Sequence, residues 1–151
     1  MSSTRSYRDL MRLTHRVTLL GDRVGERVFT EQLGVGRALF LVLRTIAEAS
    51  PSGADSQQQI AARLSLTKGT VSRHVATAAA QGWLTVQASP VSQREHALVL
   101  TPAGQALLER GLTLQQERER LADSELDPDD VAAAVRTLTV ICQLLEREDQ
   151  Q

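Results

Sequence analysis

Residues 56–104 decide the fold, and they read SQQQIAARLSLTKGTVSRHVATAAAQGWLTVQASPVSQREHALVLTPAG. Ser56 is a typical helix cap, and apolar residues such as Ile60 and Leu64 follow it at helical spacing. A second cap residue, Thr67, comes shortly after that first short helix. Two helices joined by so tight a turn indicate a helix-turn-helix, whose second helix lies in the major groove of DNA.

The second helix of this motif has an apolar face and a polar face. Val71, Val75 and Ala78 are spaced by four and three residues, and Gly82 is placed to end the helix. The polar face is predicted to offer donors and cations that reach base edges and phosphates. The candidate DNA-binding residues there are Thr67, Lys68, Thr70, Ser72, Arg73 and His74.

A β-hairpin is predicted directly after this helix. Residues 84–87 and 97–101 are β-prone runs, and residues 89–95 between them are turn-like. The tip of the hairpin holds Arg94, a cation able to enter the neighbouring minor groove. Pro102 then stands at the first position of a new helix. A hairpin after a recognition helix makes the motif a winged helix-turn-helix.

At these residues the sequence resembles the MarR (multiple antibiotic resistance regulator) family of bacterial transcription regulators. The matching pieces are residues 60–75, the Gly82-Trp83-Leu84 entry to the wing, and residues 98–108. The resemblance implies a homodimer that binds double-stranded DNA and responds to a small-molecule effector. It also implies that Arg94 contacts the minor groove.

The sequence departs from the family's pattern at several positions. The wing, which usually carries Asp-Arg-Arg, has Ser92 and Gln93 before its Arg, and the recognition helix has Thr77 and Ala78 where a basic residue and Leu are usual. Ser65 stands at a turn position often held by Gly, and it would need an unusual backbone there if the turn is left-handed. These changes remove cations and one large core side chain, and so bear on DNA affinity more than on fold.

Charge is unevenly distributed along the chain of 151 residues. The chain as a whole has 17 basic and 18 acidic side chains, whereas residues 56–104 have four basic and one acidic, and residues 105–151 have five and eleven. A local basic patch on a near-neutral chain favours a protein that reads a DNA sequence over one that coats DNA without specificity.

The remaining segments are predicted to be amphipathic or buried helices. Residues 7–28 carry an apolar stripe, residues 30–36 form a connection, and residues 37–48 are apolar nearly all round, as in a buried helix. Helices over residues 102–124 and from Pro128 onward show more apolar face than a winged helix can cover. We therefore expect a mostly α fold with a small β-wing, in which N- and C-terminal helices interleave in a homodimer.

This organisation divides the chain into three parts. Residues 1–35 are predicted to be an N-terminal dimerisation helix and connection, residues 36–104 the DNA-binding winged helix, and residues 105–151 the C-terminal dimerisation helices. No apolar run approaches a membrane span, the N-terminus has no hydrophobic signal segment, and Cys142 is the single cysteine. A cytoplasmic location and no membrane partner are the expectation.

Other candidate residues have a structural and a functional interpretation. His15 and Arg16 on the first helix could line an effector pocket, as the resemblance implies, or form a polar surface pair. His74 could pack or contact a base, and Lys68 and Arg73 could be only solvated charges. Trp83 is expected to fill the space left by Ala78, and His96 to be structural.

The chain lacks the parts of an enzyme. It has no Gly-rich phosphate loop and no nucleophile elbow, and three scattered histidines with one distant cysteine have no metal-ligand spacing. We therefore expect no catalysis, cofactor or metal. The expected function is a sequence-specific transcription regulator, a ligand-responsive repressor acting as a homodimer on a pseudo-palindromic operator. Two alternatives are a winged-helix protein–protein interaction module with weak or lost DNA binding, and a thiol switch at Cys142.

Overall fold

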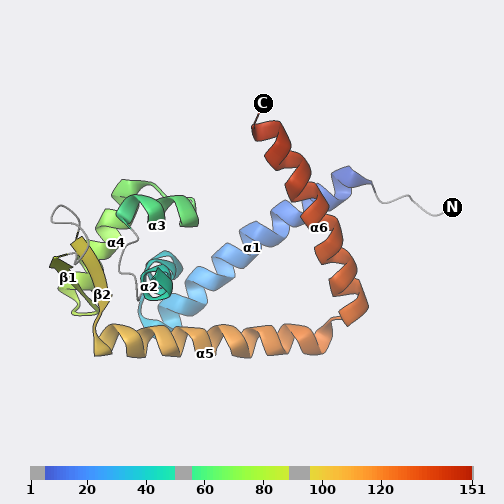
Figure 1. The fold of residues 1–151 in the computed structure, drawn as a ribbon. Coiled ribbons are helices and arrows are strands. Elements are labelled where there is room, and N and C mark those ends of the chain that lie inside the picture. Colours follow the sequence, from blue (N-terminus) through green and yellow to red (C-terminus); the bar gives the residue numbers. More distant parts are fainter. Residues whose placement is uncertain (1–5, 50–55, 89–95, 151) are drawn as a thin grey trace. The chain divides into compact units, whose positions relative to one another are not determined.

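The computed structural model describes residues 6–49, 56–88 and 96–150, with the backbone alone for Ala88 and His96. It is mostly helical and carries one small antiparallel sheet (Figure 1). Its elements in chain order are α1 (Tyr7–Leu33), α2 (Arg37–Ala49), α3 (Gln57–Leu64), α4 (Lys68–Ala80), β1 (Leu84–Ala88), β2 (His96–Leu100), α5 (Pro102–Glu125) and α6 (Pro128–Asp149).

The buried helix predicted over residues 37–48 is confirmed as α2. Phe40, Val42 and Leu43 are each 0% exposed, and the helix contacts α1, α3, α4 and β2. The Phe40 ring lies 4.7 Å from that of Phe29 on α1, centroid to centroid, and a Cβ at Gly111 of α5 would overlap it. Three helices thus meet at one aromatic side chain, because α5 has no side chain where it crosses Phe40.

The junction between α1 and α2 is held by polar contacts as well. The Glu26 carboxylate accepts a hydrogen bond of 2.8 Å from the backbone N–H of Arg37, the first residue of α2. The Arg37 guanidinium in turn donates to Asp22 at 3.1 Å. A carboxylate at the start of a helix meets the positive end of its dipole and satisfies an N–H without an intrahelical acceptor. Glu26 therefore acts as a cap supplied by the preceding helix.

The first helix is longer than predicted. We expected it to end near Val28, with residues 30–36 as a connection, but α1 continues to Leu33. It ends at Gly34, whose φ of 72° is left-handed and whose N–H donates to the Thr30 carbonyl. The packing of Phe29 against α2 keeps this last stretch helical, and nothing before Gly34 breaks the hydrogen-bond ladder.

The turn between α3 and α4 adopts the left-handed backbone that the sequence left open. Ser65 ends α3 with φ 53° and ψ 39°, a left-handed conformation, and it is the only described non-glycine residue with positive φ. The next N–H, that of Leu66, donates to the Ala61 carbonyl at 2.9 Å. Such a cap satisfies the last carbonyls of α3 and turns the chain toward α4 within two residues. A serine thus occupies a position that glycine fills at lower cost.

The wing is a two-stranded antiparallel hairpin with Leu84 opposite Leu100. Its second strand begins and ends one residue earlier than the predicted 97–101. Thr101 leaves the strand because its hydroxyl accepts from the Gly104 N–H at 3.1 Å and so caps α5. The same hydroxyl donates to the Gly82 carbonyl at 2.6 Å, and the Thr101 N–H donates to the Trp83 carbonyl. These bonds tie the start of α5 to the entry of the wing.

The predicted structural role of Trp83 also agrees with the structure. The half-buried Trp83 side chain packs against the hydrophobic core that contains Ala78. The backbone N–H of Trp83 donates to the Ala78 carbonyl at 2.9 Å. The prediction of a structural role for His96 concerns a side chain outside the described part of the molecule.

Contacts divide the chain into two compact units, Met1–Gly111 and Leu112–Gln151, and the boundary falls within α5. The winged helix, α1 and the start of α5 belong to the first unit. The division into residues 1–35, 36–104 and 105–151 remains a prediction. Among the described helices, none is both long and apolar enough to cross a membrane.

Candidate nucleic-acid interface

The N-terminus of α4 is organised by Thr67. Its hydroxyl oxygen accepts from the backbone N–H of Thr70 at 3.1 Å and lies 2.8 Å from the Thr70 hydroxyl. The Arg73 guanidinium donates to that Thr70 hydroxyl at 3.4 Å. The cap predicted at Thr67 is confirmed, and it leaves the N–H groups of Lys68 and Gly69 in a first turn that has no intrahelical acceptor for them.

Burial separates the two faces of α4 as the apolar spacing predicted. Val71, Val75 and Ala78 are at most 5% exposed. Lys68, Ser72 and Arg73 are exposed, whereas Thr70 and His74 are half-buried. His74 therefore lies at the edge of the outward face, which leaves its two interpretations, packing and base contact, both open.

Small side chains leave room around Arg73 on the outward face. Gly69 lies one helical turn before Arg73, and Ala76 lies three residues after it. Both residues are exposed. A Cβ built on Gly69 would have no neighbour nearer than the Thr67 hydroxyl at 4.0 Å. The backbone of the first turn of α4 is consequently open to a close approach by another molecule.

Carboxylates are absent from the described stretches of sequence that form this face. Residues 56–88 and 96–108 contain no Asp or Glu, while they include Arg63, Lys68 and Arg73. The described part of the helix-turn-helix therefore has cations with no anionic side chain of its own, and Arg63 finds its carboxylate partner, Glu48, on α2 at 3.4 Å. A surface of this kind attracts an extended anion such as the DNA backbone.

Several other predicted site residues lie away from α4 or outside the described residues. Arg94, together with the altered wing positions Ser92 and Gln93, falls within residues 89–95, which the structure does not describe. His15 and Arg16 are exposed on α1. Cys142 is exposed on α6 with a free thiol.

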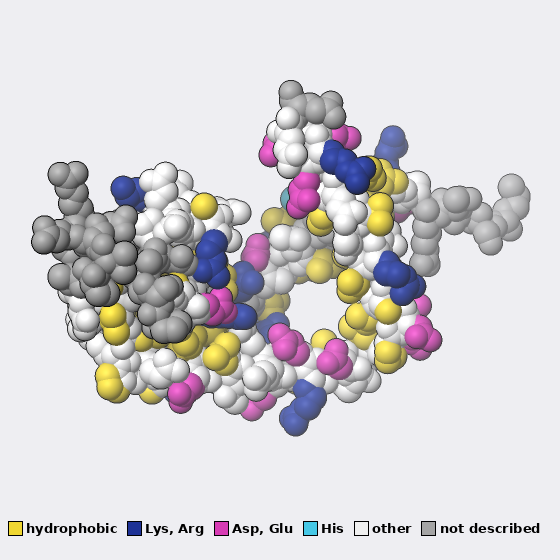
Figure 2. All heavy atoms as spheres, in the orientation of Figure 1, with side chains coloured by type: hydrophobic (Ala, Val, Ile, Leu, Met, Phe, Trp, Pro, Cys, Tyr) yellow, Lys and Arg dark blue, Asp and Glu magenta, His cyan; other side chains and the backbone are white. Residues whose placement is uncertain are grey.

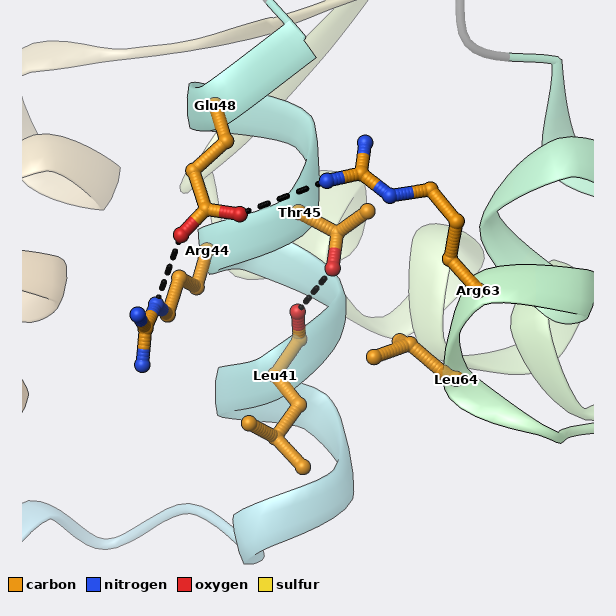
Figure 3. A pocket seen from close by; sticks show the side chains of 6 residues that line it. All are labelled: Leu41, Arg44, Thr45, Glu48, Arg63 and Leu64. Atoms are coloured by element: carbon orange, nitrogen blue, oxygen red, sulfur yellow. Dashed lines mark hydrogen bonds and ion pairs between the residues drawn. The ribbon is translucent and has the colours of Figure 1, made fainter. Parts of the chain in front are cut away.

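Sequence reasoning missed a pocket between α2 and α3. It has a volume of about 230 Å³ and is lined by Leu41, Arg44, Thr45 and Glu48 of α2 and by Arg63 and Leu64 of α3 (Figure 3). Neither His15 nor Arg16 lines it. The only signal for it in the sequence is the presence of charged residues on otherwise apolar helices, and that pattern equally indicates an ordinary solvated face.

Comparison with known proteins shows which structures this geometry resembles. Residues 33–95 match the family model described as the MarR family, and no curated protein matches the chain. Wild-type MarR from E. coli in its apo form is 26% identical, with a TM-score of 0.71 over 87% of this chain and 96% of that one.

Two further structures share the fold at lower identity. The MepR–DNA complex of S. aureus is 20% identical, with a TM-score of 0.74 over 95% of this chain and 99% of that one. MarR of Staphylococcus aureus in complex with salicylate and kanamycin is also 20% identical, with a TM-score of 0.78 over 93% of both chains. Residues 33–95 thus match the MarR family, and the chain shares the winged-helix fold of these MarR-type structures over nearly its whole length.

Proposed function

We propose that the chain is a sequence-specific DNA-binding transcription regulator, a ligand-responsive repressor that acts as a homodimer on a pseudo-palindromic operator in the cytoplasm. It acts by binding and not by catalysis. The observation that carries the proposal is the outward face of α4, where Arg73 and Lys68 are exposed beside small residues on a helix-turn-helix that contains no carboxylate in its described part.

The first turn of α4 supports a close approach to DNA. The N–H groups of Lys68 and Gly69 can donate to a phosphate at the positive end of the helix dipole. Gly69 has no side chain to hold the phosphate away. Arg73, one turn further along, is then placed to donate to a base edge or a second phosphate. Thr67, Thr70 and Ser72 supply shorter donors on the same helix, and Arg94 of the wing is proposed to enter the minor groove.

Dimerisation is supported by exposed apolar side chains on the terminal helices. Within the first unit, α1 exposes the large side chains of Leu13, Val17 and Leu20 at 49%, 68% and 44%. Within residues 112–150 of the second unit, Ile141 alone is buried, and α6 exposes large apolar side chains along its length. Figure 2 shows such side chains at the surface among the charged ones. A second copy of the chain would cover them.

A twofold dimer gives the recognition helix a partner at a fixed distance. Two copies of α4 spaced by one helical turn of DNA, roughly 34 Å, would meet equivalent half-sites of a pseudo-palindrome. An effector that prefers a different spacing would release DNA in proportion to its differential affinity for the two arrangements.

Selection from a pool of random DNA duplexes tests the proposal, followed by titration of the selected duplex in a fluorescence anisotropy assay. We expect an inverted repeat to emerge. Arg73→Gln should weaken binding to it by about 1–3 kcal/mol, since a good base or phosphate contact is worth that much. Arg23→Gln removes an exposed guanidinium from α1 and is the matched control, with an affinity equal to that of the wild type.

The dimer has its own test. Val140 is 54% exposed on α6, so Val140→Glu would be nearly neutral in a monomer. We expect it to produce monomers in sedimentation equilibrium and to lose operator binding. Gln143→Glu adds the same charge at an exposed polar position of α6 and should remain dimeric. Wild-type protein that is monomeric at micromolar concentration would refute the homodimer.

The rival function is a winged-helix module that binds another protein. It is favoured by Thr77 in place of a basic residue and by the altered wing at Ser92 and Gln93. Salt separates the two functions, because contacts to phosphates weaken steeply as salt rises, whereas an apolar protein interface does not. A thiol switch at Cys142 would make Cys142→Ser unresponsive to peroxide, and an unchanged response rules it out.

A further inference from the structure

We infer that the Thr70 hydroxyl positions the Arg73 guanidinium to read a guanine in the major groove. The inference rests on the proposed DNA binding and deepens it, because it names the base that α4 selects and the residue that prepares the contact. Arg73 touches the base, whereas Thr70 is a positioning residue that acts through Arg73. Both residues lie within the first unit, in one helix.

Arg73 lies at the centre of the outward face of α4. Helical spacing of four, three and four residues puts it in line with Gly69, Ala76 and Ala80. All four residues are exposed, and Arg73 is the one long side chain among them. When a helix lies in the major groove, its central line faces the base edges, while the phosphates flank the groove on both sides. Arg73 is therefore placed for a base edge and not for a phosphate.

The guanidinium of Arg73 selects which base it reads. A guanidinium has several N–H donors in a planar fork and no acceptor. In the major groove guanine presents two acceptors, O6 and N7, whereas adenine and cytosine present an amino donor and thymine a single acceptor beside its methyl group. A pair of parallel hydrogen bonds is thus available from guanine and from no other base.

The Thr70 hydroxyl holds the guanidinium before DNA binds. Arg73 Nη2 donates to Thr70 Oγ1 at 3.4 Å, and the guanidinium has no other partner among the described residues. A carboxylate in this position would form an ion pair that DNA must first break. A neutral hydroxyl takes up one N–H and leaves the others available for a base.

The hydroxyl of Thr70 is itself held by the helix cap. Thr70 is half-buried, and its Oγ1 lies 2.8 Å from Thr67 Oγ1. Thr67 Oγ1 also accepts from the Thr70 backbone N–H at 3.1 Å. The cap, Thr70 and Arg73 therefore form a continuous chain of hydrogen bonds. A long side chain that is ordered in advance loses less conformational entropy when it binds.

The neighbouring Thr77 does not supply the same contact. Its hydroxyl donates to the Arg73 backbone carbonyl at 3.0 Å, so its proton is directed at the helix and not at a base. The preference for guanine at this base pair therefore depends on Arg73.

A double-mutant cycle between protein and DNA tests the guanine contact. The probe is the duplex selected from the random pool, with each guanine replaced in turn, symmetrically in both half-sites, by 7-deazaguanine or by inosine. 7-Deazaguanine lacks N7, whereas inosine keeps both O6 and N7. We expect one position where 7-deazaguanine weakens binding of the wild type about tenfold or more but leaves binding of Arg73→Ala unchanged. Inosine at that position should be tolerated.

The role of Thr70 is measured as the ratio of affinities for the guanine duplex and the 7-deazaguanine duplex. Thr70→Val has the same shape without the hydroxyl and should lower this ratio about threefold, a modest effect that suits a long, exposed hydrogen bond. Thr70→Ser should restore it. Thr18→Val removes an exposed threonine hydroxyl from α1 and is the matched control, with the ratio of the wild type.

This ratio separates positioning from a structural role. Both affinities belong to the same protein sample, so a smaller folded fraction changes them equally and leaves the ratio unchanged. Thr70→Ala gives the same comparison if Thr70→Val does not fold.

The outcomes distinguish the inference from the function on which it rests. A selected operator in which no guanine is coupled to Arg73 would overturn the inference and leave the regulator standing. A ratio that is unchanged in Thr70→Val, or lowered equally in Thr70→Ser, would overturn it as well. A selection that yields no preferred sequence would refute the proposed function and the inference together.

Discussion

Replacing Ser65 by glycine should make the protein more stable, although it removes a side chain. Ser65 is exposed and held at φ 53°, and its hydroxyl makes no hydrogen bond to a described residue. A left-handed backbone costs a residue with a Cβ about 1–2 kcal/mol, and glycine avoids this cost. Glycine also increases the conformational entropy of the unfolded chain, which lowers the free energy of unfolding by about 0.4–1 kcal/mol. The net gain is about 0.5–1 kcal/mol.

Two controls separate backbone strain from other effects. Ser65→Ala removes the hydroxyl but keeps the Cβ, and so should be no more stable than the wild type. Ser72 is an exposed serine inside α4, where Ser72→Gly should cost about 0.5 kcal/mol because glycine is the poorer helix former. The two glycine variants should therefore shift stability in opposite directions.

Urea unfolding at a single protein concentration measures these differences, the fixed concentration being needed because an oligomer's stability depends on it. The midpoints should rank Ser65→Gly above the wild type and Ser72→Gly below it. If Ser65→Gly is no more stable than Ser65→Ala, the left-handed serine is not strained and the argument is wrong.

Three further substitutions test the packing and the caps. Phe40→Ala should destabilise the protein by about 3–5 kcal/mol in urea unfolding, since a fully buried aromatic ring is lost; a cost below about 1 kcal/mol would contradict its central place. Thr67→Ala should cost about 1 kcal/mol by calorimetry while Thr67→Ser costs less, and equal losses would contradict the cap. Glu26→Ala should cost about 1 kcal/mol through the lost bond to the Arg37 N–H, whereas Glu31→Ala, also exposed on α1, should be nearly neutral in the same assay.

Local signals in the sequence were enough to predict the helix-turn-helix. The caps at Ser56 and Thr67 are where the spacing placed them, and Pro102 begins α5. These predictions succeed because a cap is a contact between residues two or three apart, which the sequence displays directly. The sequence marked Ser65 as a turn position often held by glycine, but it did not establish the left-handed backbone there.

Features that depend on distant residues were not predictable. The continuation of α1 to Leu33 depends on the packing of the Phe29 ring against the Phe40 ring of α2. No pattern near Phe29 in the sequence predicts that contact. Thr101 was predicted to end the second strand but instead caps α5. This depends on its hydrogen bond to the Gly82 carbonyl, at the other end of the hairpin sequence. The contact between α5 and Phe40 requires Gly111, which in the sequence is merely a poor helix former.

The candidate sites divide in the same way. The exposed Lys68 and Arg73 follow from helical spacing, because a regular helix fixes which residues face outward. The pocket of Arg44, Glu48 and Arg63 unites residues up to 19 positions apart on two helices. Only the packing of α3 on α2 brings them together, so in the sequence they are isolated charged residues.

The measurement that tests the central claim most directly is fluorescence anisotropy of the wild-type protein with a duplex from its own upstream region. A shuffled duplex and two salt concentrations complete the design. With Lys68 and Arg73 of two protomers displacing counterions from the DNA, doubling the salt should weaken binding roughly tenfold, from a log–log slope of about −0.9 for each contact. The account predicts tight, salt-sensitive binding to the upstream duplex alone. Equally weak binding to both duplexes, unchanged by salt, would contradict it.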